Sequence, residues 1–346
     1  MSQILNSFKW WQPLKKILYC KVTGNRVPLR AEIHVTKLCN LRCIHCYYDF
    51  ESMDNVKDPG TSEMIELIDE LYANGTRWVR FLGGEPLLRS DIGELISYAT
   101  GKGMICDLNT NGYLVKKRIK ELKKLSSLCL SIDGDEESND LVRGKGSYQK
   151  IIEALDACLE NDILVRLHGV ITQYTLNSLD HLVNLARDYG VTFNVSEAAR
   201  PDMSDINLTL NEEERINFYK KFIAYKKKGW PILNSYPAME YVLNWPFGER
   251  RVVYEDDLKE RKVPFVRCQQ TLKSFLIDTD GCVYSCTGRW KMGINCFEHG
   301  FKKAWEYIGE HTSCVTCMHL GYIELSMLLN LDSRIILNAF RKMYMD

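Results

Sequence analysis

The chain has 346 residues, of which 45% are hydrophobic, so it is long enough for one large domain or for a domain with an appendage. Lysine plus arginine and aspartate plus glutamate both number 45, and the zero formal charge removes the electrostatic argument for a nucleic-acid partner. A transmembrane helix is not expected because no run of about eighteen apolar residues is present, and residues 1–20 lack a signal-peptide pattern.

The cysteine content is high for this length. There are thirteen cysteines, an odd number, and they are clustered along the chain rather than evenly spread. Without a secretory signal, this pattern argues against a disulfide scaffold and favours metal binding in a reducing compartment. We therefore expect a cytoplasmic protein that binds metal.

Strand and helix patterns alternate from residue 29 to about residue 200. Six strands are expected, at 30–36, 77–82, 104–109, 127–132, 163–171 and 191–196. Helical patterns lie between them, at 61–74, 90–102, 114–124, 147–161 and 175–189, the first with Thr61 or Ser62 as its expected cap. Six such units indicate a parallel sheet with crossover helices, but they are too few for a closed eight-stranded barrel.

The pattern changes after residue 200. A charged amphipathic helix is expected at 211–228 and irregular structure at 229–265, after which cysteines return. The expected divisions are an N-terminal extension at 1–28, a barrel core at 29–200, a connecting segment at 201–265, a cluster module at 266–320 and an amphipathic helix at 321–346.

Three cysteines share one short loop directly after the first strand: Cys39, Cys43 and Cys46. Iron–sulfur cubanes are usually held by four thiolates, so three ligands would leave one iron open to a substrate or cofactor. The carboxyl ends of strands carry the chemistry in parallel barrels, and the loop follows such an end. The alternative is a set of buried structural cysteines.

This loop resembles the hallmark C-x3-C-x-aromatic-C of the radical S-adenosylmethionine (SAM) superfamily, with His45 in the aromatic place. The resemblance implies an α/β fold, a partial (β/α)6 barrel open on one side. It also implies a [4Fe–4S] cluster whose open iron chelates SAM. An electron from a flavodoxin- or ferredoxin-type reductant would cleave SAM to methionine and a 5′-deoxyadenosyl radical, which would take hydrogen from a substrate C–H bond.

Further motifs at strand ends support the same resemblance. Gly83-Gly84-Glu85-Pro86 resembles the family's GGE motif, which implies binding of the SAM amino group through backbone carbonyls and Glu85. By the same likeness Ser131 and Arg143 would bind the SAM carboxylate, and the remaining expected cofactor contacts are Tyr48, Asn109 and Asp133. Turn residues are common at strand ends, and a solvated surface arginine is the alternative for Arg143. His34 and His168 are given no role.

A second group of cysteines follows residue 266. An Asp278–Gly281 turn is expected to join two strands as a hairpin. The stretch resembles the SPASM/twitch extension of radical SAM enzymes, which implies one auxiliary [4Fe–4S] cluster. Its expected ligands are Cys268, Cys286, Cys314 and Cys317, with Cys282 or Cys296 left open as a ligand. A structural zinc is the alternative, and Cys20, Cys106, Cys129 and Cys158 are expected to fill the core.

The resemblance predicts an enzyme that oxidises or cross-links a small molecule or a peptide. Only 38 residues precede Cys39, so a separate peptide-recognition domain ahead of it is not expected. Apolar, tryptophan and lysine residues are mixed near the N-terminus, which leaves open a lipid-linked substrate and peripheral membrane contact. A non-catalytic iron–sulfur electron carrier is the alternative from a different class.

Overall fold

The computed structural model describes residues 11–48, 57–198, 208–248, 250–260, 263–289 and 292–335. The apolar residues ahead of Trp11, which left membrane contact open in the sequence, lie outside these ranges. The last part of the helix expected at 321–346 also lies outside them. Within them, no helix is long and apolar enough to cross a membrane.

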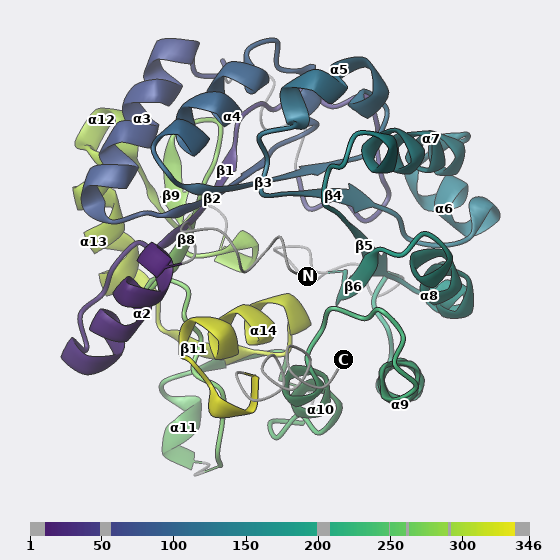
Figure 1. The fold of residues 1–346 in the computed structure, drawn as a ribbon. Coiled ribbons are helices and arrows are strands. Elements are labelled where there is room, and N and C mark those ends of the chain that lie inside the picture. Colours follow the sequence, from purple (N-terminus) through teal and green to yellow (C-terminus); the bar gives the residue numbers. More distant parts are fainter. Residues whose placement is uncertain are drawn as a thin grey trace.

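Six parallel strands in chain order form the main sheet (Figure 1): β1 (Arg30–His34), β2 (Trp78–Leu82), β3 (Ile105–Thr110), β4 (Ser127–Ser131), β5 (Val165–Ile171) and β6 (Thr192–Glu197). Five expected helices lie between them: α3 (Thr61–Asn74), α4 (Ile92–Gly101), α5 (Val115–Leu122), α7 (Ser147–Glu160) and α8 (Leu179–Asp188). The six strands and the five helices are confirmed. The N-cap of α3 is Gly60 and not Thr61 or Ser62 as expected, and the Gly60 N–H donates to the Glu63 side chain.

Alternate residues of each strand point to opposite faces, and the two faces differ in chemistry. On β1, Ala31 and Ile33 join the apolar core beneath the helices. The intervening Arg30, Glu32 and His34 point the other way, into the concave side of the sheet. The same alternation continues around the sheet, so the helix side is apolar and the concave side is polar.

The sheet does not end at β1. A strand from the second cysteine region, β8 (Ser274–Ile277), pairs in parallel with β1, and β9 (Cys282–Tyr284) and β10 (Ile294–Asn295) follow as antiparallel strands. The expected hairpin is present, with Gly281 at a φ of +83°. The first part of the cysteine-rich C-terminal region, β8 to β10, is therefore a continuation of the barrel sheet, whereas β11 (Cys314–Cys317) pairs with β7 (Val252–Tyr254) in a separate two-stranded sheet.

Several elements were missed in the sequence. α6 (Glu136–Arg143) is one: the Asp135 side chain caps it by accepting the Ser138 N–H. The segment expected to be irregular contains α10 (Tyr236–Leu243), β7 (Val252–Tyr254) and α11 (Asp257–Glu260). The helix expected at 211–228 is present as α9 (Glu212–Lys227), and α14 (Leu320–Leu329) covers the first part of the helix expected at 321–346. The other elements are α2 (Trp11–Thr23), η2 (Pro86–Leu88), η3 (Leu176–Ser178), η4 (Thr287–Arg289), α12 (Cys296–His299), α13 (Phe301–His311) and β11 (Cys314–Cys317).

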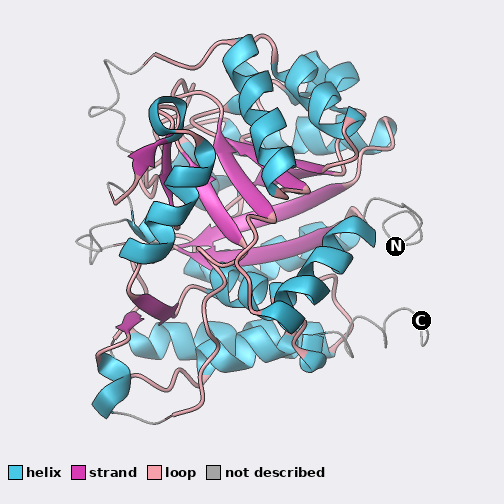
Figure 2. Cartoon of the chain, turned by 90° about the vertical axis from the view of Figure 1, so that its left-hand side faces the viewer, coloured by secondary structure: helices cyan, strands magenta, loops and turns pink. Residues whose placement is uncertain are grey.

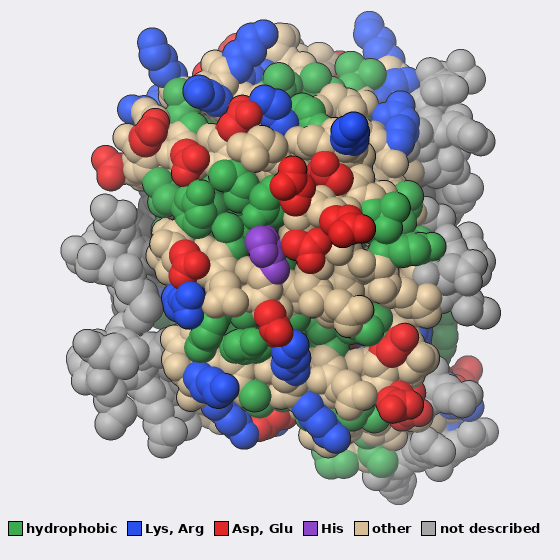
Figure 3. Space-filling view, turned by 90° about the vertical axis from the view of Figure 1, so that its right-hand side faces the viewer, with side chains coloured by type: hydrophobic (Ala, Val, Ile, Leu, Met, Phe, Trp, Pro, Cys, Tyr) green, Lys and Arg blue, Asp and Glu red, His purple; other side chains and the backbone are tan. Residues whose placement is uncertain are grey.

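The helices surround the sheet unequally. In Figure 1, α3, α4, α5, α7 and α8 cover its convex side, while α14 lies across the concave side and contacts β6 and α10. Figure 2 shows the strands crossing the middle of the molecule with helices on both sides. The surface over α6 to α9 carries acidic side chains across its middle and basic ones toward both ends (Figure 3).

Candidate active site

The cysteine loop follows the carboxyl end of β1 and is held by three neighbouring segments. From the loop after β2, the Glu85 N–H donates to the Leu38 carbonyl at 2.7 Å. From the loop after β3, the Asn111 amide donates to the Asn40 side chain at 2.9 Å. α6 contributes a carbonyl, which accepts the Ile44 N–H at 3.0 Å. The loop therefore has a defined position although it has no regular secondary structure.

Gly83 and Gly84 allow a close contact between two backbones. A Cβ at Gly83 would lie 2.4 Å from the Thr36 carbonyl oxygen, and one at Gly84 would lie 2.2 Å from the Leu38 carbonyl oxygen. Gly83 also has a φ of +149°, which other residues rarely adopt. The sequence suggested that these glycines let backbone approach a ligand, but in the structure they let it approach the stem of the cysteine loop. Pro86 begins the short helix η2 that follows.

Glu85 is buried, and both of its carboxylate oxygens accept hydrogen bonds from the protein. One oxygen accepts the Thr110 hydroxyl at 2.7 Å and the Leu87 N–H at 3.1 Å, and the other accepts the Asn111 N–H at 2.8 Å. Burial raises its pKa to about 7, against the effect of these donors. Glu85 thus ties the loops after β2 and β3 together beside the cysteine loop.

Asp133 is the centre of a buried ionic group. The Arg143 Nε lies 2.7 Å from one of its oxygens and Nη2 lies 2.8 Å from the other, while the His45 Nε2 lies at 3.5 Å. The Val170 N–H also donates to the carboxylate. Burial opposes the charge of Arg143, yet Asp133 and Cys43 raise the pKa of its guanidinium above the ordinary value. The planar fork of Arg143 therefore already binds a carboxylate, which belongs to the protein.

Tyr48 contacts the β8–β9 hairpin. Its hydroxyl lies 3.0 Å from the Thr279 hydroxyl and 3.4 Å from the Asp278 carboxylate. The same carboxylate lies 3.2 Å from the His34 Nδ1, and the Tyr47 hydroxyl lies 3.2 Å from the His34 Nε2. This group joins the end of the cysteine loop to the region that carries the second set of cysteines.

The three loop cysteines are partly exposed and interact electrostatically with one another. Burial raises the pKa of Cys39 to about 11 and also raises the pKa of Cys43, although Arg143 favours the Cys43 thiolate. A metal ligand must be a thiolate, so binding would release protons from these thiols. Three partly exposed sulfurs at one edge of the sheet form a donor set that suits an iron–sulfur cluster.

The second set of cysteines lines a cavity of about 230 Å³. Cys268, Cys286, Cys314 and Cys317 all border it, and the last two stand at the ends of β11. Burial raises the pKa of Cys268 to about 11 and that of Cys286 to about 12. The Arg289 guanidinium hydrogen-bonds with the Cys314 sulfur. The cavity is several times the volume of a water molecule, about 30 Å³, so it can hold a group of several atoms.

Cys282 and Cys296, left open as ligands by the sequence, do not border that cavity. They interact electrostatically with each other and with Asp280 instead. All thirteen cysteines lie in the described ranges, and none is in a disulfide. Within those ranges, no three His, Cys, Asp or Glu side chains converge closely enough to hold a single metal ion. The cysteines expected in the core are buried there: Cys20, Cys106, Cys129 and Cys158.

The concave side of the sheet forms a polar wall between the two cysteine sites. Glu32 lies 2.6 Å from Arg30 and 3.5 Å from Arg80, which in turn lies 3.4 Å from Asp107. Burial opposes ionisation of Glu32, but the two arginines lower its pKa to about 2. From α14, His319 and Tyr322 interact electrostatically with the same carboxylate. Charged side chains thus line the concave side and face α14.

The segment that carries the site matches a known family, and the fold matches solved structures. Residues 33–186 match the family model described as Radical SAM superfamily. This segment is a radical SAM domain. The match covers the strands and loops that carry the three loop cysteines, Glu85 and Arg143, and such proteins use a [4Fe–4S] cluster with SAM.

Curated relatives match over about half of this chain. The Fe-coproporphyrin III synthase of Methanosarcina barkeri is 35% identical over 159 residues, which are 45% of this chain and 40% of the relative. The mycofactocin maturase MftC of Mycolicibacterium smegmatis is 31% identical over 193 residues, 54% of this chain and 48% of the relative. The chain therefore matches less than half the length of each of these relatives.

Solved structures support the fold class over most of the chain. Streptococcus suis SuiB bound to precursor peptide SuiA superposes with a TM-score of 0.67 at 17% identity, covering 88% of this chain and 72% of that one. Native anSMEcpe with bound AdoMet gives a TM-score of 0.63 at 18% identity, covering 82% of this chain and 83% of that one. The expected partial barrel with a small cysteine-rich C-terminal region is confirmed.

Sequence reasoning missed several residues that hold the loop. Asn111 makes the contact to it, whereas the neighbouring Asn109, which was singled out, accepts a hydrogen bond from Arg166 on the concave side at 3.4 Å. Asp58 accepts the Lys37 N–H at 2.9 Å. Ser131 ends β4 beside His168. The alternation of side chains along β3 could have separated inward Asn109 from the loop residue Asn111, but it does not name their partners.

Proposed function

We propose that this protein is a radical SAM enzyme that cleaves SAM reductively and removes a hydrogen atom from a substrate C–H bond. The observation that carries the proposal is the position of Cys39, Cys43 and Cys46. They are partly exposed, at the carboxyl edge of a parallel sheet and next to its polar concave side. When bound, a [4Fe–4S] cluster with SAM supplies the one-electron chemistry, and the three cysteines would hold it.

The chain's own residues would position this chemistry and protect it. Glu85 and Asn111 hold the cysteine loop against the neighbouring strand ends. Arg143 lies close enough to Cys43 to stabilise its thiolate. Because the Arg143 fork is bound to Asp133, its remaining N–H groups are the ones we assign to the SAM carboxylate, together with Ser131.

We further propose that Cys268, Cys286, Cys314 and Cys317 hold one auxiliary [4Fe–4S] cluster. Their shared cavity of about 230 Å³ supports a multi-atom group over the zinc alternative. Four protein ligands would leave no open iron, which favours electron transfer from the substrate over substrate binding. Arg289 would stabilise the Cys314 thiolate.

We propose a biosynthetic role in the cytoplasm, and the names of the relatives support the biosynthetic part. One is named for the synthesis of Fe-coproporphyrin III and another for the maturation of mycofactocin, and a structural neighbour binds a precursor peptide. We therefore propose oxidation or cross-linking of a small molecule or a peptide. A flavodoxin- or ferredoxin-type protein would deliver the electron.

The proposal is tested by anaerobic reconstitution with iron and sulfide, followed by dithionite and SAM. The wild type should form 5′-deoxyadenosine, and Cys43→Ala should not. Cys286→Ser should keep about half of the iron if two cubanes are present, whereas Cys282→Ser, outside the cavity, should keep all of it. A wild type that binds iron but forms no 5′-deoxyadenosine would instead fit a non-catalytic electron carrier.

A lipid-linked substrate is the second candidate, and one observation favours it. On α2, Leu14, Leu18 and Val22 are 38%, 46% and 85% exposed, and lysines stand between them. Apolar and basic residues in this arrangement occur on helices that lie at membrane surfaces. Co-sedimentation with anionic vesicles, lost in Leu18→Glu, would support this candidate, whereas equal sedimentation of both proteins would argue against it.

A further inference from the structure

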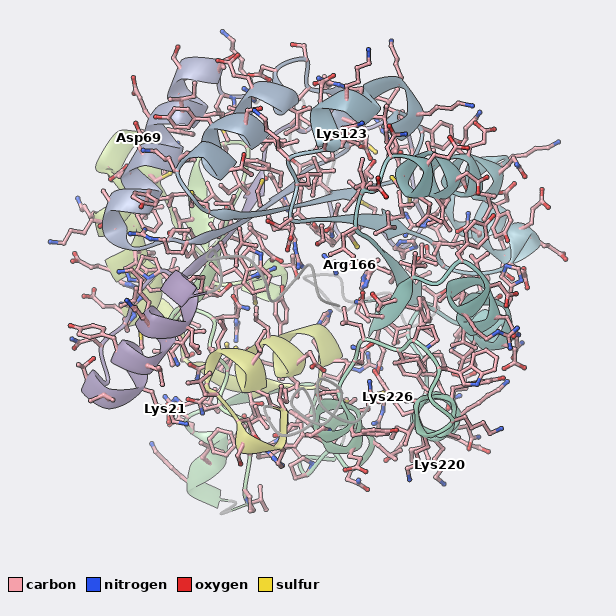
Figure 4. All side chains as sticks on the ribbon, in the orientation of Figure 1. Lys21, Asp69, Lys123, Arg166, Lys220 and Lys226 are labelled. Atoms are coloured by element: carbon pink, nitrogen blue, oxygen red, sulfur yellow. The ribbon has the colours of Figure 1, made fainter. Side chains whose placement is uncertain are left out.

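On the concave wall of the sheet, Arg166 has no role in either of the two cysteine sites described above. Arg166 lies on β5, between strands that carry Cys129 and Thr192 at the same level. Figure 4 places its label in the middle of the molecule, between the sheet and α14. Its side chain is largely enclosed but keeps some accessible surface. It therefore faces the interior and can still be reached by a ligand.

Arg166 differs from the other arginines of this wall. Arg30 and Arg80 each lie within 3.5 Å of a carboxylate oxygen. Across the described parts of the chain, no ion pair involves Arg166, and its side chain donates a hydrogen bond to a neutral group, the Asn109 side chain, at 3.4 Å. Burying a guanidinium costs free energy unless an anion compensates it.

The charged side chains around Arg166 carry a net positive charge. Arg30, Arg80 and Arg166 carry three positive charges against the two negative charges of Glu32 and Asp107. His168 adds no charge, because burial and the neighbouring Arg166 lower its pKa to about 3. These three arginines and two carboxylates are thus one negative charge short of neutrality, at the position of Arg166.

We propose that Arg166 binds a carboxylate group of the substrate inside the barrel. The proposal rests on the function proposed above, because it assumes that the substrate enters the concave side. A carboxylate matches the planar fork of arginine and supplies the single missing charge, whereas a phosphate monoester carries about −1.5 to −2 at neutral pH. The neutral His168–Asn194–Ser196 group beside it offers polar contacts to the same ligand.

The first test compares the thermal unfolding of reconstituted variants. Arg166→Met removes an uncompensated charge, so its Tm should rise by about 2 °C in the absence of ligand. Arg80→Met is the matched control on the same wall, and its Tm should fall because Glu32 and Asp107 each lose an arginine partner. An Arg166→Met variant destabilised as much as Arg80→Met would overturn the proposal.

The second test uses acids and their neutral amides as probes. 3-Phenylpropionate and a pentapeptide with a free C-terminus should raise the wild-type Tm more than 3-phenylpropionamide and the amidated pentapeptide do. Arg166→Met should weaken binding of the acids at least about tenfold, and Arg166→Lys, which keeps the charge without the fork, should weaken it less. Stabilisation by the small acid alone indicates a small-molecule substrate, and stabilisation by the peptide acid alone indicates a peptide C-terminus.

Equal effects of acid and amide, or acid binding undiminished in Arg166→Met, would overturn the proposal. Stronger stabilisation by inorganic phosphate than by either acid would also contradict it. 5′-Deoxyadenosine is assayed on the same wild-type preparation. Its absence alongside Arg166-dependent acid binding would count against the proposed enzyme only, whereas its presence without acid binding would count against the carboxylate site only.

Discussion

Several residues at this site make contacts within the protein, in addition to the cofactor contacts that the motifs implied. Glu85, Tyr48 and Arg143 were expected to contact SAM. In the structure, each makes a contact within the protein beside the cysteine loop: Glu85 with the loop after β3, Tyr48 with the β8–β9 hairpin and Arg143 with Asp133. Their substitution would therefore change the position of the cysteines as well as any contact to the cofactor.

The Asp133–Arg143 pair gives a prediction at this scale. Asp133→Asn leaves the buried guanidinium without its carboxylate, so the free energy of unfolding should fall by about 3 kcal/mol in urea denaturation. The exposed Arg187–Asp188 pair provides the control, and Asp188→Asn should change it by less than about 0.5 kcal/mol. Similar values for the two variants would show that the buried pair does not stabilise the fold.

Glu85 gives a prediction about pH. Burial raises its pKa from 4.5 to about 7, so the folded protein keeps a proton that the unfolded chain has already released between these values. The free energy of unfolding should therefore fall as pH rises through this range. Glu85→Gln lacks this effect, so its stability relative to the wild type should improve between about pH 5 and 8 by on the order of 1–3 kcal/mol. The free energies of unfolding of the two metal-free proteins are measured by urea denaturation at each pH. If they change with pH in parallel, the prediction is contradicted.

At the scale of elements, the site depends on loops that pack against each other at one edge of the sheet. The strands bring these loops into register, since β1 pairs with β2 and β2 with β3 over most of their length. The Gly83-Gly84 segment then passes close to the stem of the cysteine loop. The local geometry of the cysteines is thus set by strand pairing and by the lack of side chains at two positions.

Gly84→Ala tests this packing. Its Cβ would meet the Leu38 carbonyl at 2.2 Å, so the two loops must separate. We expect a loss of about 2 kcal/mol or more in the free energy of unfolding, and less iron bound at the first site after reconstitution. Gly101→Ala is the control, since nothing lies within 4 Å of its Cβ and it sits in a helix, where alanine is favoured. Unchanged iron content in Gly84→Ala would show that the close approach is not required.

At the scale of the whole molecule, the first part of the C-terminal cysteine region extends the sheet of the partial barrel. β8 pairs with β1 along the edge that the six core strands leave open, and α14 lies over the concave side. Tyr48 and His34 contact the same hairpin. The hairpin that precedes Cys286 thus belongs to the same sheet as the cysteine loop, whereas Cys314 and Cys317 lie on β11, which pairs with β7 in a separate two-stranded sheet.

Truncation tests this continuity. A chain that ends at residue 265 lacks β8 and exposes the edge of β1, next to the cysteine loop. Unpaired strand edges promote aggregation. We expect this fragment to aggregate in analytical ultracentrifugation and to lose cooperative unfolding. A monomeric fragment with a cooperative transition would show instead that the six-stranded core is an independent domain.

The sequence by itself determined the type of fold and the position of the cysteine loop. These features are local: apolar periodicity reports helices and strands, and three cysteines in eight residues stay together in any fold. α6 was missed because it is short and polar, and α10 because aromatic and proline residues obscured its pattern.

Only the tertiary structure decided how distant residues meet. It placed Cys268 and Cys286 with the pair on β11 and kept Cys282 apart, and it directed the Arg143 fork to Asp133. It also left Arg166 without a carboxylate among the described residues. These outcomes depend on strand pairing and side-chain direction across long stretches of chain, which residue types and spacing do not specify.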